Sequence, residues 1–420
     1  MKRISKKLKK SLADVLPLSS VLEVVIREEL RDFVIQQGIC ALTKILEEER
    51  TALCGAPYER GGQPARRAGS APGQLVMGGR KIFVKRPRVR DDDGELSLAS
   101  YQQFSEEDPL AHRALEQMVI GVSTRKYERS LEAVPEELGP RSTSKSSVSR
   151  RFIAATQEQL TACLKRSLSE LDIQCVMLDG IHLAGHLVVI AVGIDAGGHK
   201  HVLGFWEGST ENSEVCVSLL SDLVERGLHA QQSMLFVIDG GKALRKAIQK
   251  VFGKRALVQR CQIHKMRNVL GHLPKDMHRS TRQAMREAYA SASFKTAKRR
   301  LKQLAASLAD DHPGAEASLL EGLEETLTLK NFGLSKSLER SLASTNIIEN
   351  LNGSVRRVTR RVKNWKSGVM ALRWVASSVI DAEKKFRRLR GHKGMPKLVE
   401  YLRAHDQEID QHLDDDKVAA

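Results

Sequence analysis

Two aspartates, Asp179 and Asp239, occupy matching places in the chain. Each ends an apolar, strand-like run and is followed at once by glycine. In α/β sheets the carboxyl ends of strands are where ligands bind, and neighbouring strands lie about 4.8 Å apart. If these two strands are neighbours, their carboxylates share one site and repel each other unless a cation lies between them. Either Asp alone is an ordinary turn residue or helix cap, but the matched context favours a metal site for phosphoryl chemistry.

A third carboxylate, Glu349, begins a segment of strong helical periodicity. An apolar stripe is formed by Ile348, Leu351, Val355, Val358 and Val362. Glu349 lies on a different line of this helix, which continues through Gly353, Arg356, Arg360 and Lys363. A carboxylate that precedes a basic helix face suits a metal ligand beside a bound polyanion. The segment from Asn346 to Glu349 is also a capping box, and the spacing alone favours that structural role.

Cys261 and His264 form a Cys-x-x-His motif after the last strand-like run. This is half of a zinc site, but no second pair has the required spacing, so we do not expect zinc. His264 could contact a nucleic acid or orient a catalytic carboxylate. The alternative is a small buried thiol followed by an imidazole that caps a helix.

The elements that must position these residues are clearest between 173 and 261. Strands are predicted at CVMLDG, LVVIAVGID, HVLGFWEG, MLFVIDG and ALVQRC, and helices at 213–226 and 243–252. The order βββαβαβ predicts an antiparallel meander followed by right-handed crossovers that add parallel strands.

The flanking regions are predicted to be mostly helical. We expect a helix at 17–53, with the apolar positions Leu22, Val25, Ile26, Leu30, Phe33 and Val34 at helical spacing. The Gly-, Pro- and Arg-rich stretch 55–79 should be a loop, and a short β section should follow at 81–89. Residues 274–343 should be helical, followed by one long helix beyond 344, another at about 366–390, and a disordered acidic tail.

Residues 110–160 have the pattern of a DNA-reading unit. One helix contains Leu115, Met118 and Val119, and Ser123 can cap a second. A third helix, capped by Ser146 or Ser147, would turn Val148, Phe152 and Ile153 inward and expose Lys145, Ser149, Arg150 and Arg151. Helix, turn, helix and basic helix is what a major-groove reader needs. The alternative is an ordinary three-helix unit with a solvated basic face.

Composition limits the class of protein. The 420 residues are too many for one core, so we expect two or three domains. Lys and Arg total 68 against 51 Asp and Glu, which gives a charge of +17 and a pI near 9.7. This excess favours nucleic acid as a partner, although ribosome-associated and membrane-surface proteins are also basic. We expect no membrane span and no signal peptide, and the six scattered cysteines fit a reducing cytoplasm.

Several segments together resemble the bacterial insertion-sequence transposases of the Mutator type, a branch of the DDE transposases. The resemblance covers about 175–390 and rests on LDGIH, GIDAGGHKHVLGFWEGSTENSEVCVSLLSDLVERGL, VIDGGKAL, CQIHKMRNV and STNIIENLNGSVRR. GVSTRKYERSL with SKSSVSR resembles the helix-turn-helix of that family. A Cys-x-x-His motif before a long helical insertion that leads to the Glu is a specific feature of the resemblance.

The resemblance implies an α/β, ribonuclease-H-like catalytic domain with a mixed five-stranded sheet and an all-helical insertion. It implies that Asp179, Asp239 and Glu349 are catalytic residues that bind two Mg²⁺ ions, with Mn²⁺ as a possible substitute and Cys261 and His264 as accessory residues. The domains would be 1–105 (helical and small β), 106–165 (helix-turn-helix), 170–273 with 344–390 (catalytic), 274–343 (insertion) and 391–420 (tail).

The expected activity is binding of the inverted-repeat ends of an insertion sequence, followed by DNA cleavage and strand transfer. The expected partners are double-stranded DNA, both element ends and target, and at least a second copy of the chain, with no membrane and no small-molecule substrate, in the cytoplasm on the nucleoid. The candidate DNA-binding residues are Arg125, Lys145, Ser149, Arg150, Arg151, Arg356, Arg357, Arg360, Arg361 and Lys363. The alternatives are a sequence-specific regulator that retains the fold without catalysis, and a ribonuclease-H-type nuclease acting on RNA.

Overall fold

The computed structural model describes residues 18–59, 65–77, 80–106, 112–119, 122, 145–208 and 212–418. By its internal contacts the chain divides into two units, 1–155 and 156–420. Across the described ranges, every helix is too short or too polar to cross a membrane.

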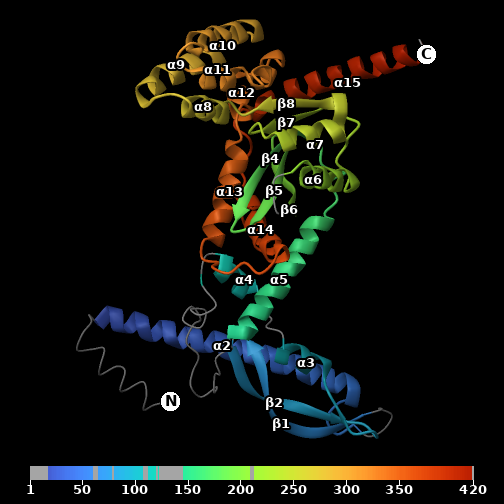
Figure 1. The fold of residues 1–420 in the computed structure, drawn as a ribbon. Coiled ribbons are helices and arrows are strands. Elements are labelled where there is room, and N and C mark those ends of the chain that lie inside the picture. Colours follow the sequence, from blue (N-terminus) through green and yellow to red (C-terminus); the bar gives the residue numbers. More distant parts are fainter. Residues whose placement is uncertain are drawn as a thin grey trace. The chain divides into compact units, whose positions relative to one another are not determined.

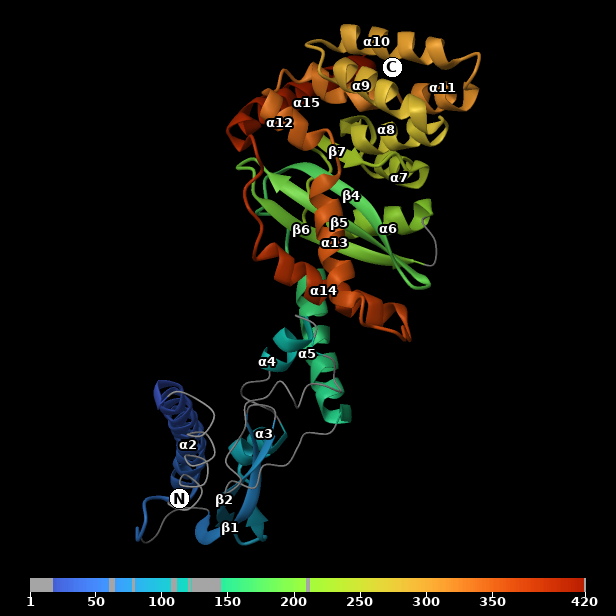
Figure 2. The ribbon, with the colours of Figure 1, turned by 90° about the vertical axis from the view of Figure 1, so that its left-hand side faces the viewer.

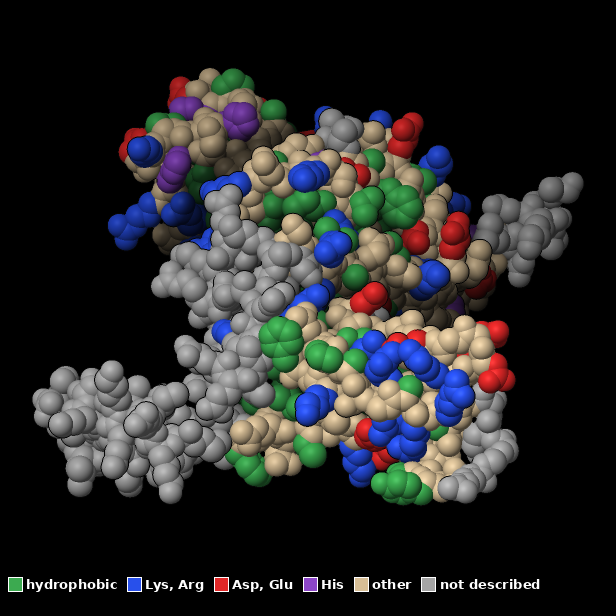
Figure 3. All heavy atoms as spheres, turned by 90° about the horizontal axis from the view of Figure 1, so that it is seen from below, with side chains coloured by type: hydrophobic (Ala, Val, Ile, Leu, Met, Phe, Trp, Pro, Cys, Tyr) green, Lys and Arg blue, Asp and Glu red, His purple; other side chains and the backbone are tan. Residues whose placement is uncertain are grey.

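The first unit combines one long helix with a small antiparallel sheet. Its elements are α2 (Leu18–Cys54), β1 (Arg66–Met77), β2 (Arg80–Arg90), β3 (Glu95–Leu96), α3 (Ala99–Glu106) and α4 (His112–Val119). A core that includes Leu42, Leu46 and Leu75 joins α2 to the sheet. Lys and Arg side chains gather over this sheet, as the space-filling view shows (Figure 3).

The loop predicted at 55–79 is wrong in its second half, because 66–77 forms strand β1. The glycines and proline that suggested a loop are compatible with β1 because it is the edge strand of the order β1-β2-β3. Gly69 has a φ of 76° at the irregularity between Arg67 and Ser70, where the register shifts. At Gly73 a Cβ would come within 2.8 Å of the Tyr101 hydroxyl, so any larger residue there would displace the Tyr101 side chain of α3.

Helix α2 is confirmed, and two of the apolar residues that indicated it, Phe33 and Val34, are 57% and 61% exposed. In α5 (Lys145–Lys165), Val148 and Phe152 are buried as predicted, whereas Ile153, also predicted to face inward, is 44% exposed. Apolar residues at helical spacing thus predict the helix, but the spacing does not fix which of them lie within the buried stripe.

The second unit is built on a five-stranded mixed sheet. Its strands are β4 (Ile173–Leu183), β5 (His186–Asp195), β6 (Lys200–Gly208), β7 (Met234–Ile238) and β8 (Ala256–Arg260), in the order β6-β5-β4-β7-β8. Strands β4, β5 and β6 pair antiparallel, while β4, β7 and β8 pair parallel. The predicted order βββαβαβ is therefore confirmed, and the two apolar runs that end near Asp179 and Asp239 are neighbours.

Helices cover both faces of this sheet, which is why its strands are apolar on both sides (Figure 2). On one face Val176 and Leu178 pack with α6 (Ser213–Glu225) and α7 (Lys242–Phe252). On the other, Cys175 and Met177 pack in a core shared by α13 (Asn346–Thr359), α14 (Gly368–Glu383) and α15 (Met395–Val418). Helix α13 thus crosses the sheet and carries its first turn to the end of the strands.

The segment between β8 and α13 is helical throughout (Figure 1). It contains α8 (Gln262–Gly271), η4 (Lys275–Met277), α9 (His278–Tyr289), α10 (Phe294–Leu308), α11 (Pro313–Leu320), η5 (Glu324–Asn331) and α12 (Lys336–Leu342). Its own core includes Met285, Leu301 and Leu327. Helix α11 and η5 are separate elements, because Gly322 adopts a φ of 60° between them.

Both helices predicted near the C-terminus are present, but each is shorter than expected. Helix α13 ends at Thr359, and α14, predicted at about 366–390, spans Gly368–Glu383. The tail expected to be disordered forms α15, because Met395, Leu398 and Leu402 lie on one face and are buried in the main core. Asp406 fixes this helix further by accepting hydrogen bonds from the Ser233 backbone at 2.7 Å and from Arg255 at 2.6 Å.

Candidate active site

Asp179 and Asp239 lie at equivalent positions on adjacent parallel strands. Met177 of β4 is paired with Val237 of β7, and each aspartate follows its strand's member of this pair by two residues. The register therefore places both carboxylates at the same edge of the sheet. This arrangement is the one predicted from the matched sequence contexts.

The Asp179 carboxylate lies in a confined, largely buried environment. Oδ2 accepts a hydrogen bond from Asn352 Nδ2 of α13 at 2.7 Å, and Oδ1 accepts one from the Gly180 backbone at 3.0 Å. Burial, and next the negative charge of Asp239, raise the pKa of Asp179 to about 6. The two carboxylates thus repel each other, which is the electrostatic condition that a bound cation relieves.

The turn after Asp239 is tightly packed. Asp239 Oδ1 accepts a hydrogen bond from the Gly241 backbone at 2.8 Å. Gly240 has a φ of 109°, and a Cβ there would lie 2.0 Å from Nε of Arg260. Arg260 is itself bound to the helical segment between β8 and α13 through Glu321, whose backbone and side-chain oxygens both accept at 3.1 Å. Only glycine therefore fits behind Asp239, and Arg260 connects this turn to that helical segment.

Glu349 lies in the first turn of α13, but the capping-box interpretation is wrong. The helix begins one residue earlier than that interpretation requires, so Thr345 is the N-cap and Asn346 is the first helical residue. The Glu349 carboxylate accepts a hydrogen bond from Thr345 Oγ1 at 3.0 Å instead of capping a backbone N–H of Asn346. His264 and Arg267 lie 3.7 and 4.0 Å from its two oxygens.

Cys261 and His264 belong to the same network. Buried Cys261 caps α8 by accepting from the His264 backbone at 3.5 Å, and it also accepts from the Thr345 backbone at 3.4 Å. Burial raises the pKa of the Cys261 thiol, but the hydrogen bonds from His264 and Thr345 outweigh burial and lower it overall. The hydrogen bond with Cys261 raises the pKa of His264, and the charges of Glu349 and Asp239 add to this shift.

Thr345 is central in this network because its hydroxyl has one proton and three neighbours. Its Oγ1 lies 3.0 Å from Glu349 Oε1, 3.2 Å from His264 Nδ1 and 3.4 Å from Cys261 Sγ. If His264 carries a proton on Nδ1, it donates to Thr345, which then donates its own proton to Glu349. A protonated His264 thus orients the Glu349 carboxylate through Thr345.

The structure brings some of the predicted site residues closer together than others. The potential ligand atoms of Cys261, His264 and Glu349 lie within 4.8 Å of one another, the only such trio of acidic, His or Cys side chains in the described ranges. The carboxylates of Asp179, Asp239 and Glu349 do not form such a trio. His264 interacts electrostatically with all three of them, so it connects the aspartate pair with Glu349.

Sequence reasoning missed two residues of this site, Asn352 and Thr345. Asn352 is fully buried, and its Oδ1 has no hydrogen-bond partner among the described residues. A signal for it was present, because Asn352 follows Ile348 by four residues and so places a polar side chain on the apolar stripe. No comparable signal marks Thr345.

The predicted DNA-binding residues are only partly described. Arg125, and the second of the three helices predicted at 110–160, lie outside the described residues, as does the side chain of Lys145. Arg150 is exposed on α5, while Ser149 and Arg151 are half-buried. All five basic residues near the end of α13 are exposed: Arg356 and Arg357 on the helix, and Arg360, Arg361 and Lys363 beyond its end.

Comparison with known proteins identifies the class. The family model for the Mutator family of transposases matches residues 12–388, and the chain belongs to this family. Among its relatives, the transposase for insertion sequence element IS256 in transposon Tn4001 of Staphylococcus aureus is 28% identical over 381 residues, covering 87% of this chain and 93% of the relative. The ISRM5 transposase of Rhizobium meliloti is 28% identical over an alignment that covers 86% of this chain and 90% of the relative. The IS6120 transposase of Mycolicibacterium smegmatis is 29% identical over an alignment that covers 68% of this chain and 86% of the relative.

Proposed function

We propose that this protein is the transposase of an insertion sequence, which binds the ends of its element, cleaves the DNA there and joins it to a target. The catalytic domain would be ribonuclease-H-like and of the DDE type. The observation that carries the proposal is the pair Asp179 and Asp239, in register on adjacent strands with mutually repelling carboxylates. Membership of the Mutator family supports the same function.

The residues at this sheet edge fit divalent cations. Asp179, Asp239 and Glu349 offer the hard oxygen ligands that Mg²⁺ and Mn²⁺ prefer, and the buried Asn352 Oδ1 beside Asp179 is an unpartnered oxygen within the described residues. We propose that the three carboxylates hold two such ions. When bound, the ions would supply Lewis-acid stabilisation of the scissile phosphate and activation of the attacking hydroxyl group.

The protein's own groups would hold these ligands in place. Asn352 fixes one oxygen of Asp179 and favours its ionised form, because it donates a hydrogen bond to the carboxylate. Thr345 fixes Glu349, and His264 adds positive charge near all three carboxylates. Arg260 would hold the Asp239 turn against the insertion.

DNA recognition would involve two sets of basic residues. The exposed face of α5, as the third helix of a helix-turn-helix, would read the element's ends through Arg150. The basic residues at the end of α13, the opposite end of that helix from Glu349, would contact phosphates of the bound DNA. Pairing of two ends would require at least two copies of the chain on the DNA.

The proposal is tested by incubating the purified protein with a duplex that contains an element end, in Mg²⁺, in Mn²⁺ and in chelator. We expect nicks at the end and joined products only when metal is present. Specific binding without any nick would instead support a regulator that retains the fold without catalysis. Cleavage that requires an RNA strand and yields no joined product would support a ribonuclease.

A further inference from the structure

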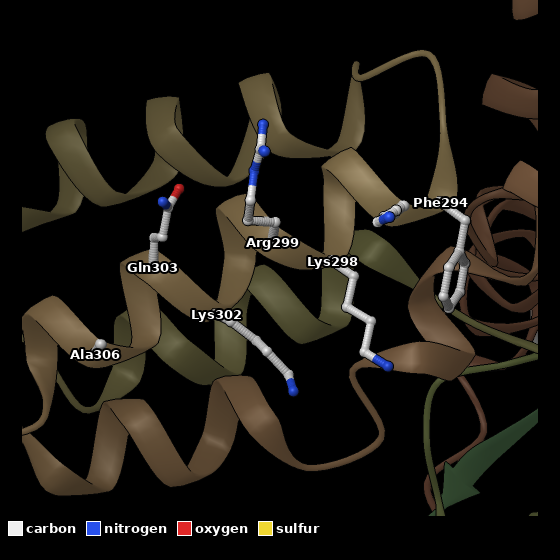
Figure 4. Close-up of a pocket in the computed structure, with 7 residues that line it drawn as sticks. Phe294, Lys298, Arg299, Lys302, Gln303 and Ala306 are labelled. Atoms are coloured by element: carbon white, nitrogen blue, oxygen red, sulfur yellow. The ribbon is translucent and has the colours of Figure 1, made fainter.

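Helix α10 of the insertion has a groove on its outer face, with a volume of about 550 Å³ (Figure 4). In the close-up, Lys298 and Lys302 extend to one side of the groove, and Arg299 and Gln303 to the other. Its lining residues are Phe294, Lys295, Lys298, Arg299, Lys302, Gln303 and Ala306. Every one belongs to α10, and four of them are cationic.

Positive charge is concentrated in this half of the insertion. Helices α9 and α10 together contain eight Lys and Arg but only one acidic residue, Glu287. In α11 and η5 the balance is reversed, with three Glu against Lys330 alone. Such a division of charge is typical of a surface that faces a partner, because an ordinary solvated surface has both signs interspersed.

Two of the four cations in the groove have no acidic partner among the described residues. Lys298 forms an ion pair with Glu324 at 2.5 Å, and Lys302 interacts with the same carboxylate at longer range, whereas Lys295 and Arg299 form no ion pair with the described residues. In the first unit, by comparison, Arg67, Arg86 and Arg88 of the sheet each form an ion pair with a glutamate; Arg88, for example, binds Glu95 at 2.6 Å. The α10 groove thus presents charges available to an external anion.

The arrangement opposes the stability of the helix itself. Lys295 lies in the first turn, near the positive end of the helix dipole, where acidic residues are favoured. Lys295 and Arg299, like Lys298 and Lys302, are like-charge pairs four residues apart, which destabilise a helix. The buried side of α10 consists of Ala297, Leu301, Ala305 and Leu308, so packing does not require these cations. An anionic ligand is the simplest physical reason for them.

We propose that this face of α10 binds the phosphate backbone of duplex DNA without reading its sequence. The proposal rests on the proposed function, which supplies DNA as the partner. Lys295 and Lys302 are seven residues apart, about 10 Å along the helix, which matches about three phosphates of one strand. A single-stranded nucleic acid is less well matched, because its binding sites present aromatic side chains for stacking. Here the only aromatic residue, Phe294, is half-buried with the Lys298 ammonium 5.8 Å from its ring centre.

The test is the salt dependence of binding to a random-sequence duplex. A triple variant, Lys295→Gln with Arg299→Gln and Lys302→Gln, should bind about tenfold more weakly at low salt. The slope of log affinity against log salt should become shallower by about 2 to 3, since each lost phosphate contact contributes about 0.9. The matched control replaces three exposed lysines of the catalytic domain (Lys246→Gln, Lys250→Gln and Lys254→Gln) and should leave the slope unchanged.

An unchanged slope in the α10 variant, or an equal change in the control, would overturn the proposal. A greater loss of single-stranded RNA binding than of duplex binding would also overturn it and indicate an RNA site. If the triple variant melts at a lower temperature than the parent, Arg299→Gln alone should still reduce the slope by about 0.9. Metal-dependent cleavage of end DNA by the parent protein tests the proposed function separately, because the salt slopes measure binding to random-sequence DNA and require no cleavage.

Discussion

The two parts of the candidate active site, the aspartate pair and Glu349, differ in the charges that surround their carboxylates. Around Asp179 and Asp239 the protein places two acids in a confined space, and burial and repulsion raise the pKa of Asp179 to about 6. Around Glu349 it places His264 and Arg267, within 3.7 and 4.0 Å. Among the described residues no cation lies within ion-pair distance of either aspartate, where His264 acts only at longer range, whereas Glu349 has His264 and Arg267 beside it. The difference suggests that the aspartates form the primary cation site and that Glu349 completes it.

The largest effect should come from removing the charge of Glu349. Glu349→Gln keeps an oxygen that can accept from Thr345, so its folding free energy should change by no more than about 0.5 kcal/mol. Cleavage of end DNA should fall by about a thousandfold or more, because a neutral amide holds a divalent ion weakly. Denaturant unfolding and a cleavage assay measure the two effects.

The control is Glu214→Gln, which removes the same charge from an exposed position on α6. It should cleave at the parental rate. Near-normal cleavage by Glu349→Gln would show that Glu349 has only a structural role at the start of α13. The third ligand would then have to be found elsewhere.

A smaller effect is expected from Asn352→Ala, which acts on the aspartate part of the site. Its hydrogen bond lowers the pKa of Asp179, so removing it should raise that pKa above 6 and leave less of the carboxylate ionised. Cleavage should fall by about ten- to a hundredfold near pH 6.5, in line with 1.5–3 kcal/mol for a hydrogen bond to a charged group, and recover in part as the pH rises. The measurement is a pH–rate profile.

Asn350→Ala is the matched control, since Asn350 is exposed on the same helix. Its profile should coincide with that of the parent. If Asn352→Ala lowers the rate equally at every pH, Asn352 only packs the helix against the sheet. The assignment as a positioning residue for Asp179 would then be wrong.

The metal-free protein should lose stability as the pH rises through this range. The pKa of Asp179 is about 6 when folded against 3.8 in the unfolded chain, so its stabilising contribution is complete below pH 4 and is lost as the pH passes 6. The loss amounts to roughly 3 kcal/mol at most. Asp239→Asn removes the negative charge that helps to raise the pKa of Asp179, so the unfolding free energy of this variant should fall less between pH 4 and 7.

Metal addition provides a second test of the aspartate pair as a cation site. At pH 7, Mg²⁺ or Mn²⁺ should raise the melting temperature of the parent, because a ligand that binds only the folded state stabilises it. The rise should be much smaller for Asp239→Asn, and this variant should still bind DNA but not cleave it. Equal metal-induced shifts in the two proteins would contradict a shared site.

The aspartate part of the site could be predicted from the sequence, because buried strands are legible as continuous apolar runs. The runs before Asp179 and Asp239 predicted strands that the structure confirms as neighbours. The order βββαβαβ was likewise predictable, since Gly-rich turns and amphipathic helices separate the strands. In these segments local pattern and tertiary packing agree.

The glutamate part was less predictable, because its geometry depends on contacts between distant segments. Thr345 meets Cys261 and His264 across more than 80 residues of sequence, and no local pattern indicates that contact. A shift of one residue in the start of α13 also changed the partner of Glu349 from a backbone N–H to Thr345. Strand β1 was missed for a related reason: an edge position tolerates Gly and Pro, but only the fold shows which strands are edges.

The smallest expected effect separates two kinds of DNA contact. Arg150 is exposed on α5, the helix proposed to read element ends, whereas Arg360 is exposed just beyond the end of α13, at the opposite end of that helix from Glu349. Arg150→Ala should reduce the preference for end DNA over random DNA by about five- to a hundredfold, the 1–3 kcal/mol of a base contact. Arg360→Ala should weaken both DNAs equally, by a few-fold, and make the salt slope shallower by about 1. Gel-shift titrations of each variant with end DNA and with random DNA, over a range of salt, give both affinities and their salt slopes. If the two variants behave alike, α5 does not read sequence, and its arginine contacts the backbone just as Arg360 does.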